Sequence, residues 1–378
     1  MAVCNKSARA GRLIALATAI SLAAVTGYAE DLAPLQKADG VAAASPAQQA
    51  AWAKLAASGP DALLSILQGM KDTDTVGQNW LRAACDAAAE RIVAEGGFPL
   101  LRLQSFLADQ SQSPRARQTA FEWVVKVDPS AKEPLLEKML DDRSLALRYR
   151  AVAALLAKAD GDADEAAAKK ELYAKALTAA RDEKQLKQIA ATLEELGESV
   201  DLPGVMGFLK QWRVIGPFDN TGLAHFDTAY PPESEQDFAA TYPGKQGGYP
   251  DQQGGVSWKE VTATGEGGEV DFIEPLGKVK EAVAYAYTTF NCKGGAAQVR
   301  YQSKNATKVW LNGELIATNE VYHSGGGIDQ YRAKVRLKPG ENTLLVKALQ
   351  NEQKMPWERE WDFRLRVVDE LGTPLASQ

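Results

Sequence analysis

The stretch KVWLNGELI, residues 308–316, decides the fold of the second half of the chain. Two apolar runs flank Asn312-Gly313, and both of these residues tolerate the positive φ angles that a two-residue hairpin turn requires. A second turn, Lys-Pro-Gly-Glu at 338–341, has proline and glycine in the order that a type II turn favours. The pattern predicts antiparallel strands joined by tight turns.

The chain beyond residue 205 continues this β pattern. It holds five of the eight tryptophans and eight of the eleven tyrosines, and aromatic residues suit a pleated surface. Short strands with this spacing predict a two-sheet antiparallel β-sandwich. The predicted strands are Trp212–Ile215, Val283–Phe290, Ala297–Gln302, Thr307–Leu311, Glu314–Thr318, Gln330–Leu337, Asn342–Leu349 and Asp362–Val368.

The first half has the features of Ala-rich amphipathic helices. Ser113-Pro114 and Asp128-Pro129 each combine a capping residue with proline at the first helical position. Ala-containing segments that begin at Arg82, Arg117 and Arg150 recur at steps of 35 and 33 residues. A period of this length is typical of stacked helix pairs. The sequence therefore predicts an α-solenoid, with an ordinary helical bundle as the alternative.

One helix pair in this half resembles a known repeat. Residues 129–159 contain a helix, an Asp141-Asp142 turn and a second helix beginning SLALRYRAVAAL at Ser144, and they are similar to a HEAT repeat. The resemblance implies a short curved α-solenoid that holds another macromolecule or braces a neighbouring domain.

The second half resembles a galactose-binding-like jelly roll, of the kind joined to glycoside hydrolases in exported bacterial proteins. The resemblance is carried by residues 212–220, 282–289, 308–316, 337–347 and 361–367. It implies a sugar-binding or accessory module, although these motifs mainly determine the fold.

The N-terminus has the three parts of a secretory signal peptide: a basic front, an uncharged core from Leu13 to Val25, and small residues before a cut after Ala29. We expect a periplasmic or secreted protein, with an uncleaved membrane anchor as the alternative for this segment. The predicted segments are a signal peptide at 1–29, a linker at 30–45, a HEAT-like α-solenoid at 46–203, a hinge at 204–211 and a galactose-binding-like β-sandwich at 212–372.

The net charge limits which classes of partner the chain can bind, and the cysteine content indicates whether it has disulfides. The chain carries 43 Lys and Arg against 49 Asp and Glu, a net charge of −6, and removal of 1–29 with its three basic residues makes this −9. This balance argues against nucleic acid and against an anionic membrane surface after signal cleavage. Cys85 and Cys292 are too few and too distant for a disulfide framework, and we expect both to be buried free thiols.

Sequence motifs for catalysis are missing. The two histidines, His225 and His323, are far apart, and no nucleophile elbow, phosphate loop or zinc spacing occurs. Acids at 160, 162, 164 and 171 match positions of a calcium loop, but Glu165 stands where that loop needs glycine. We expect no catalytic residues, no cofactor and no metal, and leave the calcium question open.

Loop aromatics are the better candidates for a binding site, because an aromatic face stacks on the apolar face of a sugar ring. Trp357 lies in a charged loop, Tyr322 and His323 precede the glycines at 325–327, and Asp329 follows them. We predict these four as ligand-binding residues. Trp310 and Trp361 lie on predicted strands, and we expect both side chains to be buried in the core.

These observations favour an exported, non-enzymatic binding or scaffold protein. Its solenoid would contact an envelope or secreted protein, and its sandwich would bind carbohydrate or protein. The alternative is an accessory or weakly active component of polysaccharide degradation, which would need a pair of carboxylates that the sequence does not single out.

Overall fold

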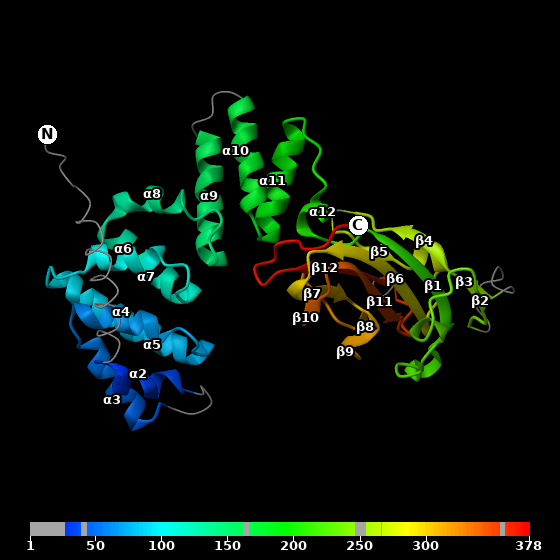
Figure 1. Ribbon diagram of the computed structural model, residues 1–378, viewed down its shortest axis with the longest axis horizontal. Helices are drawn as coiled ribbons and strands as arrows, with labels where there is room; N and C mark the ends of the chain where they lie inside the picture. Colours follow the sequence, from blue (N-terminus) through cyan, green and yellow to red (C-terminus); the bar gives the residue numbers. More distant parts are fainter. Residues whose placement is uncertain (1–26, 39–43, 162–165, 246–254, 266, 356–359) are drawn as a thin grey trace, which may run out of the picture. The chain divides into compact units, whose positions relative to one another are not determined.

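The computed structural model describes residues 27–38, 44–161, 166–245, 255–265, 267–355 and 360–378. The chain forms two compact units, residues 1–180 (unit 1) and 181–378 (unit 2). Unit 1 is helical and unit 2 contains antiparallel sheets, so the predicted order of helices before β-sheets is confirmed (Figure 1). The division assigns residues 181–203, predicted as part of the helical domain, to unit 2.

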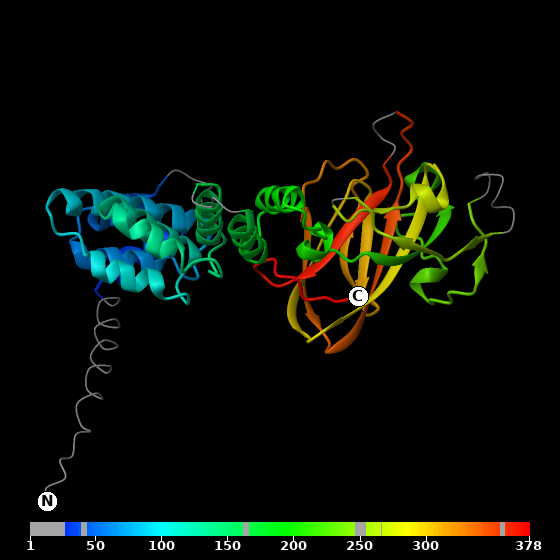
Figure 2. The same cartoon turned by 90° about the horizontal axis from the view of Figure 1, so that it is seen from above.

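The helices of unit 1 lie one after another in chain order, which Figures 1 and 2 both show. Unit 1 contains α2 (Ala29–Gln36), α3 (Pro46–Ala56), α4 (Pro60–Gly69), α5 (Thr75–Ala94), α6 (Leu100–Ala108), α7 (Pro114–Val127), the 3-10 turn η1 (Pro129–Ala131), α8 (Lys132–Leu136), α9 (Leu145–Gly161) and α10 (Ala166–Ala179). The segment predicted as a linker thus contains α2. Leu32 and Leu35, three residues apart, bury one side of this helix, which contacts α3 and α5.

Local sequence signals begin several of these helices. Ser45 and Gln48 form a reciprocal capping box before α3, and Ser113 accepts a hydrogen bond from the Ala116 N–H before α7. Further along, the buried Arg117 of α7 makes a bidentate ion pair with Asp142, at 2.5 and 2.6 Å, in the turn that leads to α9. This ion pair joins α7 to the turn before α9, and both charged side chains are almost fully buried.

Unit 2 has two main sheets. The six-stranded sheet has the order β4-β1-β6-β11-β8-β9, and the four-stranded sheet has the order β10-β7-β12-β5. Their strands are β1 (Gln211–Asp219), β4 (Lys259–Thr262), β5 (Val270–Asp271), β6 (Ala282–Cys292), β7 (Gly295–Ser303), β8 (Ala306–Leu311), β9 (Glu314–Asn319), β10 (Tyr331–Leu337), β11 (Gly340–Leu349) and β12 (Asp362–Val368). The remaining elements are α11 (Glu183–Glu195), α12 (Leu202–Met206), α13 (Ile273–Leu276), the 3-10 turns η2 (Thr221–Leu223) and η3 (Pro231–Glu233), and the pair β2 (Thr241–Tyr242) and β3 (Val256–Ser257).

The core of unit 2 draws on both main sheets. Val214 and Ala286 of the six-stranded sheet belong to one buried cluster with Val299 and Phe363 of the four-stranded sheet. Each sheet therefore has an inner face in this cluster and an outward face on its other side. Trp361 is fully buried in the same cluster, as predicted.

The cysteines test an expectation about burial. Both cysteines are free, and Cys85 is buried as expected, which raises the pKa of its thiol to about 12. The expected burial of Cys292 is wrong, because this residue ends β6 and is only half-buried. Among the described residues, no helix is both long and apolar enough to cross a membrane.

Candidate functional site

The candidate site lies on the outward face of the six-stranded sheet, where β1 and β6 are paired. Trp212 and Val214 belong to the core cluster, so the residue between them, Arg213, points to the outward face. In β6, Ala286 is a core residue and the next residue, Tyr287, packs against a separate cluster on the outward face. The register sets Arg213 directly opposite Tyr287.

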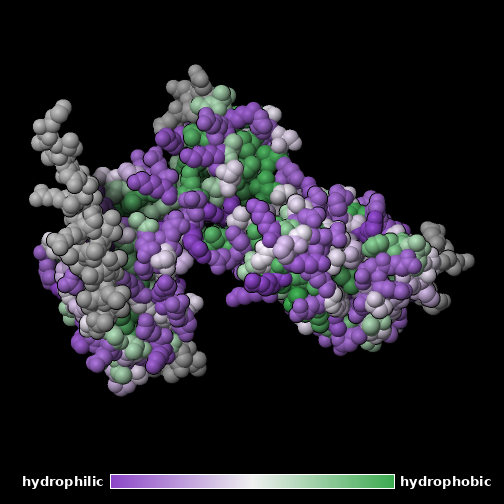
Figure 3. Space-filling model, in the orientation of Figure 1, coloured by the Kyte–Doolittle hydropathy of each residue, from purple (hydrophilic) through white to green (hydrophobic). Residues whose placement is uncertain are grey.

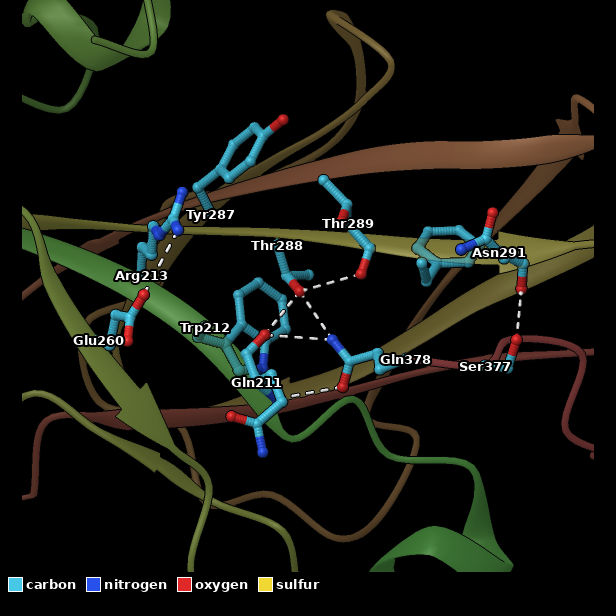
Figure 4. A pocket seen from close by; sticks show the side chains of 11 residues that line it. Gln211, Trp212, Arg213, Glu260, Tyr287, Thr288, Thr289, Asn291, Ser377 and Gln378 are labelled. Atoms are coloured by element: carbon cyan, nitrogen blue, oxygen red, sulfur yellow. Dashed lines mark hydrogen bonds and ion pairs between the residues drawn. The ribbon is translucent and has the colours of Figure 1, made fainter. Parts of the chain in front are cut away.

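A pocket of about 380 Å³ opens beside this pair, between the start of β1 and the end of β6 (Figure 4). Polar and apolar groups contribute equally to its wall, and one ion pair lies at its edge. The polar side chains include those of Gln211, Thr289, Asn291, Ser377 and Gln378, together with Arg213, Glu260 and Tyr287.

The Gln378 side chain links the two strands at the pocket. Its Oε1 accepts hydrogen bonds from the backbone N–H groups of Lys210 (2.6 Å) and Gln211 (3.0 Å). Its Nε2 donates to the Gln211 carbonyl (3.1 Å) and to Thr288 Oγ1 (2.7 Å). Both ends of this amide are therefore occupied, and the pocket has a fixed wall on this side.

Aromatic rings form the opposite side of the site. The Arg213 guanidinium lies 4.4 Å from the centre of the Phe238 ring and 3.3 Å from Glu260. The Phe238 ring contacts Trp258 and Tyr287, with centroids 5.3 and 5.2 Å apart. Partial burial raises the pKa of Tyr287, so its hydroxyl is neutral at physiological pH and can donate a hydrogen bond.

The chemical groups of the pocket are mainly suited to hydrogen bonding and ring contact. The pocket offers amide and hydroxyl donors and acceptors, a guanidinium and a ring, and it contains a single carboxylate, Glu260, which is well exposed. The described residues also contain no group of three or more His, Cys, Asp or Glu that could hold a metal ion.

Two of the predicted ligand residues, Tyr322 and His323, are neighbours in the chain and do not line the pocket, although Tyr322 packs against the same outward cluster as Tyr287. The Tyr322 hydroxyl accepts a hydrogen bond from Asn220 Nδ2 (3.4 Å), and its carbonyl accepts one from Asn351 Nδ2 (3.4 Å). His323 Nε2 lies 3.4 Å from Gln353 Nε2 and 3.9 Å from a Glu352 carboxylate oxygen. The two residues are half-buried or exposed in a setting rich in amides.

Asp329, the third described candidate, is engaged inside the fold. Its carboxylate contacts Arg366 (2.6 and 2.8 Å) and Arg300 (2.9 Å), and the side chains of all three are 6% exposed. Burial alone would raise the pKa of Asp329, but the hydrogen bonds and charges of Arg366 and Arg300 outweigh it and lower that pKa. The structure thus gives the Asp329 carboxylate two hydrogen-bonded arginine partners and does not bring it together with Tyr322 and His323.

The fourth candidate, Trp357, lies outside the described residues, as do Asp162, Asp164 and Glu165 of the calcium-like segment. Trp310, favoured for the core by the sequence, is instead half-buried and packs against the outward cluster. Side chains alternate between the two faces of a strand, and in β8 Val309 and Leu311 face the core, so Trp310 between them faces outward.

Sequence reasoning missed the residues of the pocket itself. Arg213 and Tyr287 alternate with core residues in β1 and β6, and this alternation was available as a signal. The proximity of Arg213 and Tyr287 could not be predicted from the sequence, because it depends on the pairing of strands about 70 residues apart in the chain.

A carboxylate pair also lies in unit 2. Asp362 of β12 and Asp271 of β5 are directly opposite in an antiparallel pair, so their side chains share a face of the four-stranded sheet. Burial, with the negative charges of Glu269 and Asp271, raises the pKa of Asp362 to about 6 against the opposing effect of Lys304.

Unit 1 has a groove of about 850 Å³ between α8, α9 and α10. Its floor includes Leu136, Leu155 and Leu172, and in the view of Figure 3 apolar areas come to the surface over α9 and α10. Four lysines and two glutamates surround the floor: Lys132, Lys138, Lys158, Lys175, Glu133 and Glu137. The rim is thus positive overall.

Comparison with known proteins gives little further information. A scan against protein-family models finds no matching family, and a search of curated proteins finds no match. Among solved structures, the chain is similar to a GH31 alpha-xylosidase from Xanthomonas citri, with a TM-score of 0.17 and 14% identity. The match covers 29% of this chain and only 14% of the xylosidase chain, and a likeness at this level establishes neither fold nor function.

Proposed function

We propose that this chain is an exported, non-enzymatic binding protein whose unit 2 binds carbohydrate and whose unit 1 contacts another protein. The pocket beside Arg213 and Tyr287 is the observation that carries the carbohydrate assignment. In this proposal unit 2 is a closed β-sandwich of the galactose-binding-like type, which is supported by the core that both sheets share. Unit 1 is a HEAT-like solenoid, supported by the succession of its helices.

The chemistry of the pocket matches a neutral sugar. Amide and hydroxyl side chains such as Gln211 and Thr289 exchange hydrogen bonds with sugar hydroxyls. The ring of Tyr287, which lines the pocket and packs against Phe238, offers apolar surface to the C–H face of a pyranose. Glu260 balances the charge of Arg213, so the site has no excess charge that would favour an ionic ligand.

The test is calorimetric titration of the chain lacking residues 1–29 against a panel of neutral and charged oligosaccharides. We expect at least one neutral sugar to bind, and Arg213→Ala and Tyr287→Ala to weaken that binding about tenfold or more, the loss of one good contact. Lys334→Ala and Tyr149→Ala, at a β10 position and an exposed α9 position, are the matched controls. Binding that survives both pocket substitutions, or no binding to any glycan, would contradict the assignment.

The groove between α8, α9 and α10 supports the protein-contact role of unit 1. An amphipathic helix with acidic flanks would place apolar residues on Leu136 and Leu155 and carboxylates by the lysines. Cross-linking in the envelope should give a defined partner product that Lys138→Glu and Lys175→Glu together abolish. An unchanged cross-link pattern in that double variant would assign the contact to another surface.

Export is a separate part of the proposal and rests on the N-terminal sequence. N-terminal sequencing of the protein from an envelope fraction should begin at Glu30. A chain that retains residues 1–29 in the cytoplasm would contradict export.

The second candidate function is weak hydrolysis in a polysaccharide-degrading system, favoured by the Asp271–Asp362 pair. A carboxyl group with its pKa raised to about 6 beside a second carboxylate has the character of a general acid. Release of reducing sugar that Asp362→Asn and Asp271→Asn each abolish would support this candidate. Binding without release would leave the non-enzymatic proposal in place.

A further inference from the structure

The pocket residues belong to a longer line of side chains that crosses the whole six-stranded sheet. The registers pair one residue from each strand directly with the next, so all six lie in one row on the outward face. This row, called here the ring row, consists of Glu260, Arg213, Tyr287, Leu345, Trp310 and Leu315 in strand order β4-β1-β6-β11-β8-β9.

Four of the six residues of the ring row are aromatic or aliphatic, and three of these four keep part of their surface in water. Tyr287 and Trp310 are half-buried, and Leu315 is 48% exposed although it is a large apolar residue. Leu345 is buried between the two aromatic residues and belongs to the outward cluster against which both pack. Two rings therefore flank an aliphatic base and keep part of their surface in water.

A second row of hydroxyl and amide groups runs beside the ring row. Gln211 is paired with Thr262, and Thr289 with Thr343. The row ends at Asn312, whose Oδ1 accepts a hydrogen bond from the Thr343 N–H (3.0 Å). None of these side chains carries a charge, and this polar row includes two residues of the pocket in Figure 4, Gln211 and Thr289.

The other side of the ring row is closed by chain segment 226–228. Lys347 and Lys308 lie in the next row of the sheet. The fully buried Lys347 donates to the carbonyls of Phe226 (2.9 Å) and Thr228 (2.6 Å), and Lys308 pairs with Asp227 (2.6 Å). These bonds hold the segment over the sheet, so a ligand on the ring row meets a wall on one side and the polar row on the other.

The dimensions follow from sheet geometry. Neighbouring strands lie about 4.8 Å apart, so Tyr287 and Trp310, two strands apart, are about 10 Å apart, and the six strands span about 24 Å. An extended polysaccharide presents ring faces and hydroxyl edges at regular intervals over such lengths. A single sugar would fill only the part of this surface beside the pocket.

We propose that the ring row and the polar row together bind a linear, neutral polysaccharide that lies across the strands. This inference rests on the proposed carbohydrate function and extends its site from the Arg213–Tyr287 pocket to Trp310 and Leu315. The sugar rings stack on the ring row and their hydroxyls hydrogen-bond the polar row. Arg213 and Glu260 are the sole charged residues of the two rows and form an ion pair, so the surface favours an uncharged chain.

The test measures the affinity of the chain lacking residues 1–29 for β-linked gluco-, xylo- and manno-oligosaccharides, from disaccharide to hexasaccharide. We expect the affinity to rise with length. Trp310→Ala should weaken hexasaccharide binding about tenfold, the loss of one ring contact, and leave disaccharide binding unchanged. Tyr287→Ala should weaken both. Trp310→Phe should restore most of the hexasaccharide affinity, and the half-buried Trp52→Ala in unit 1 is the control.

The outcomes separate the two proposals. If Trp310→Ala binds the hexasaccharide as wild type does while Tyr287→Ala loses it, the extended site is overturned and the carbohydrate function stands. Affinity that does not rise beyond the disaccharide also overturns the extended site. If none of these oligosaccharides binds, the neutral-polysaccharide inference falls, and the broader glycan panel decides the carbohydrate function itself.

Discussion

The outward faces of the two sheets of unit 2 use polar residues in opposite ways. On the four-stranded sheet, Arg332, Arg300 and Arg366 lie in one cross-strand row, and Asp329 contacts all three, at 4.0, 2.9 and 2.6 Å. On the six-stranded sheet, the corresponding polar residues line an open pocket. Polar groups whose partners are in the protein hold the fold, whereas polar groups that face solvent remain available to a ligand.

The same comparison separates two buried acids on the four-stranded sheet. Asp329 has arginine partners that lower its pKa, whereas burial, with smaller contributions from Glu269 and Asp271, raises the pKa of Asp362 to about 6. The difference teaches that burial alone does not define a functional carboxylate. What differs is whether hydrogen-bonded arginines outweigh the cost of burial, as they do for Asp329, or whether burial prevails, as it does for Asp362.

The largest expected effect is that of Asp329→Asn. The substitution leaves the row of three arginines without its counter-charge, and removal of one partner of a buried ion pair costs about 3–5 kcal/mol of unfolding free energy. Asparagine tolerates the positive φ of 59° at this position, so the loss reflects charge and not backbone strain. Urea unfolding measures it, with the exposed Glu314→Gln as control. A variant as stable as the control would remove the distinction between the two faces.

A smaller effect of opposite sign is expected for Asp362→Asn. The folded pKa of about 6 lies above the unfolded value of about 3.9, so ionisation costs stability as pH rises from 3.9 to 6, and the full cost remains above 6. The variant should therefore be more stable than wild type by about 2–3 kcal/mol at pH 8. At about pH 2.5, where both states are protonated, the two should coincide. Unfolding curves at both pH values check this, and equal stability at pH 8 would contradict the raised pKa.

The smallest effect on stability is expected for Glu260→Gln on the open face. The Arg213–Glu260 pair is exposed to water, with 43% and 82% of its side chains accessible, and such pairs contribute about 0–1 kcal/mol. Thermal unfolding at low and high salt should scarcely separate this variant from wild type. A loss comparable to that of Asp329→Asn would mean that the pocket residues are structural.

Much of the local structure could be predicted from the sequence. β8 and β9 begin and end within one residue of the predicted strands, because Asn312-Gly313 determines the turn and apolar runs flank it. β4 was missed because Lys259–Thr262 is largely exposed and lacks an apolar alternation. α2 was missed because a single turn of buried leucines, in a segment with Pro34, is a weak helical signal.

The candidate site was less predictable. Loop position selected Tyr322, His323 and Asp329, yet the arginine partners of Asp329 come from β7 and β12, 29 and 37 residues away. The pocket and the ring row draw on strands instead of loops. A rule that looks for exposed aromatics between strands therefore passes over half-buried ones within them, such as Tyr287 and Trp310.

The sequence by itself determined the order of helices and sheets, the tight turns and the alternation of residues along each strand, because these depend on contacts between near neighbours. Only the tertiary structure decided which residues of different strands stand side by side. Strand register depends on pairing between distant segments, and a shift of one residue moves every side chain to the other face. The alignment of Arg213, Tyr287 and Trp310 in one row is a consequence of that register.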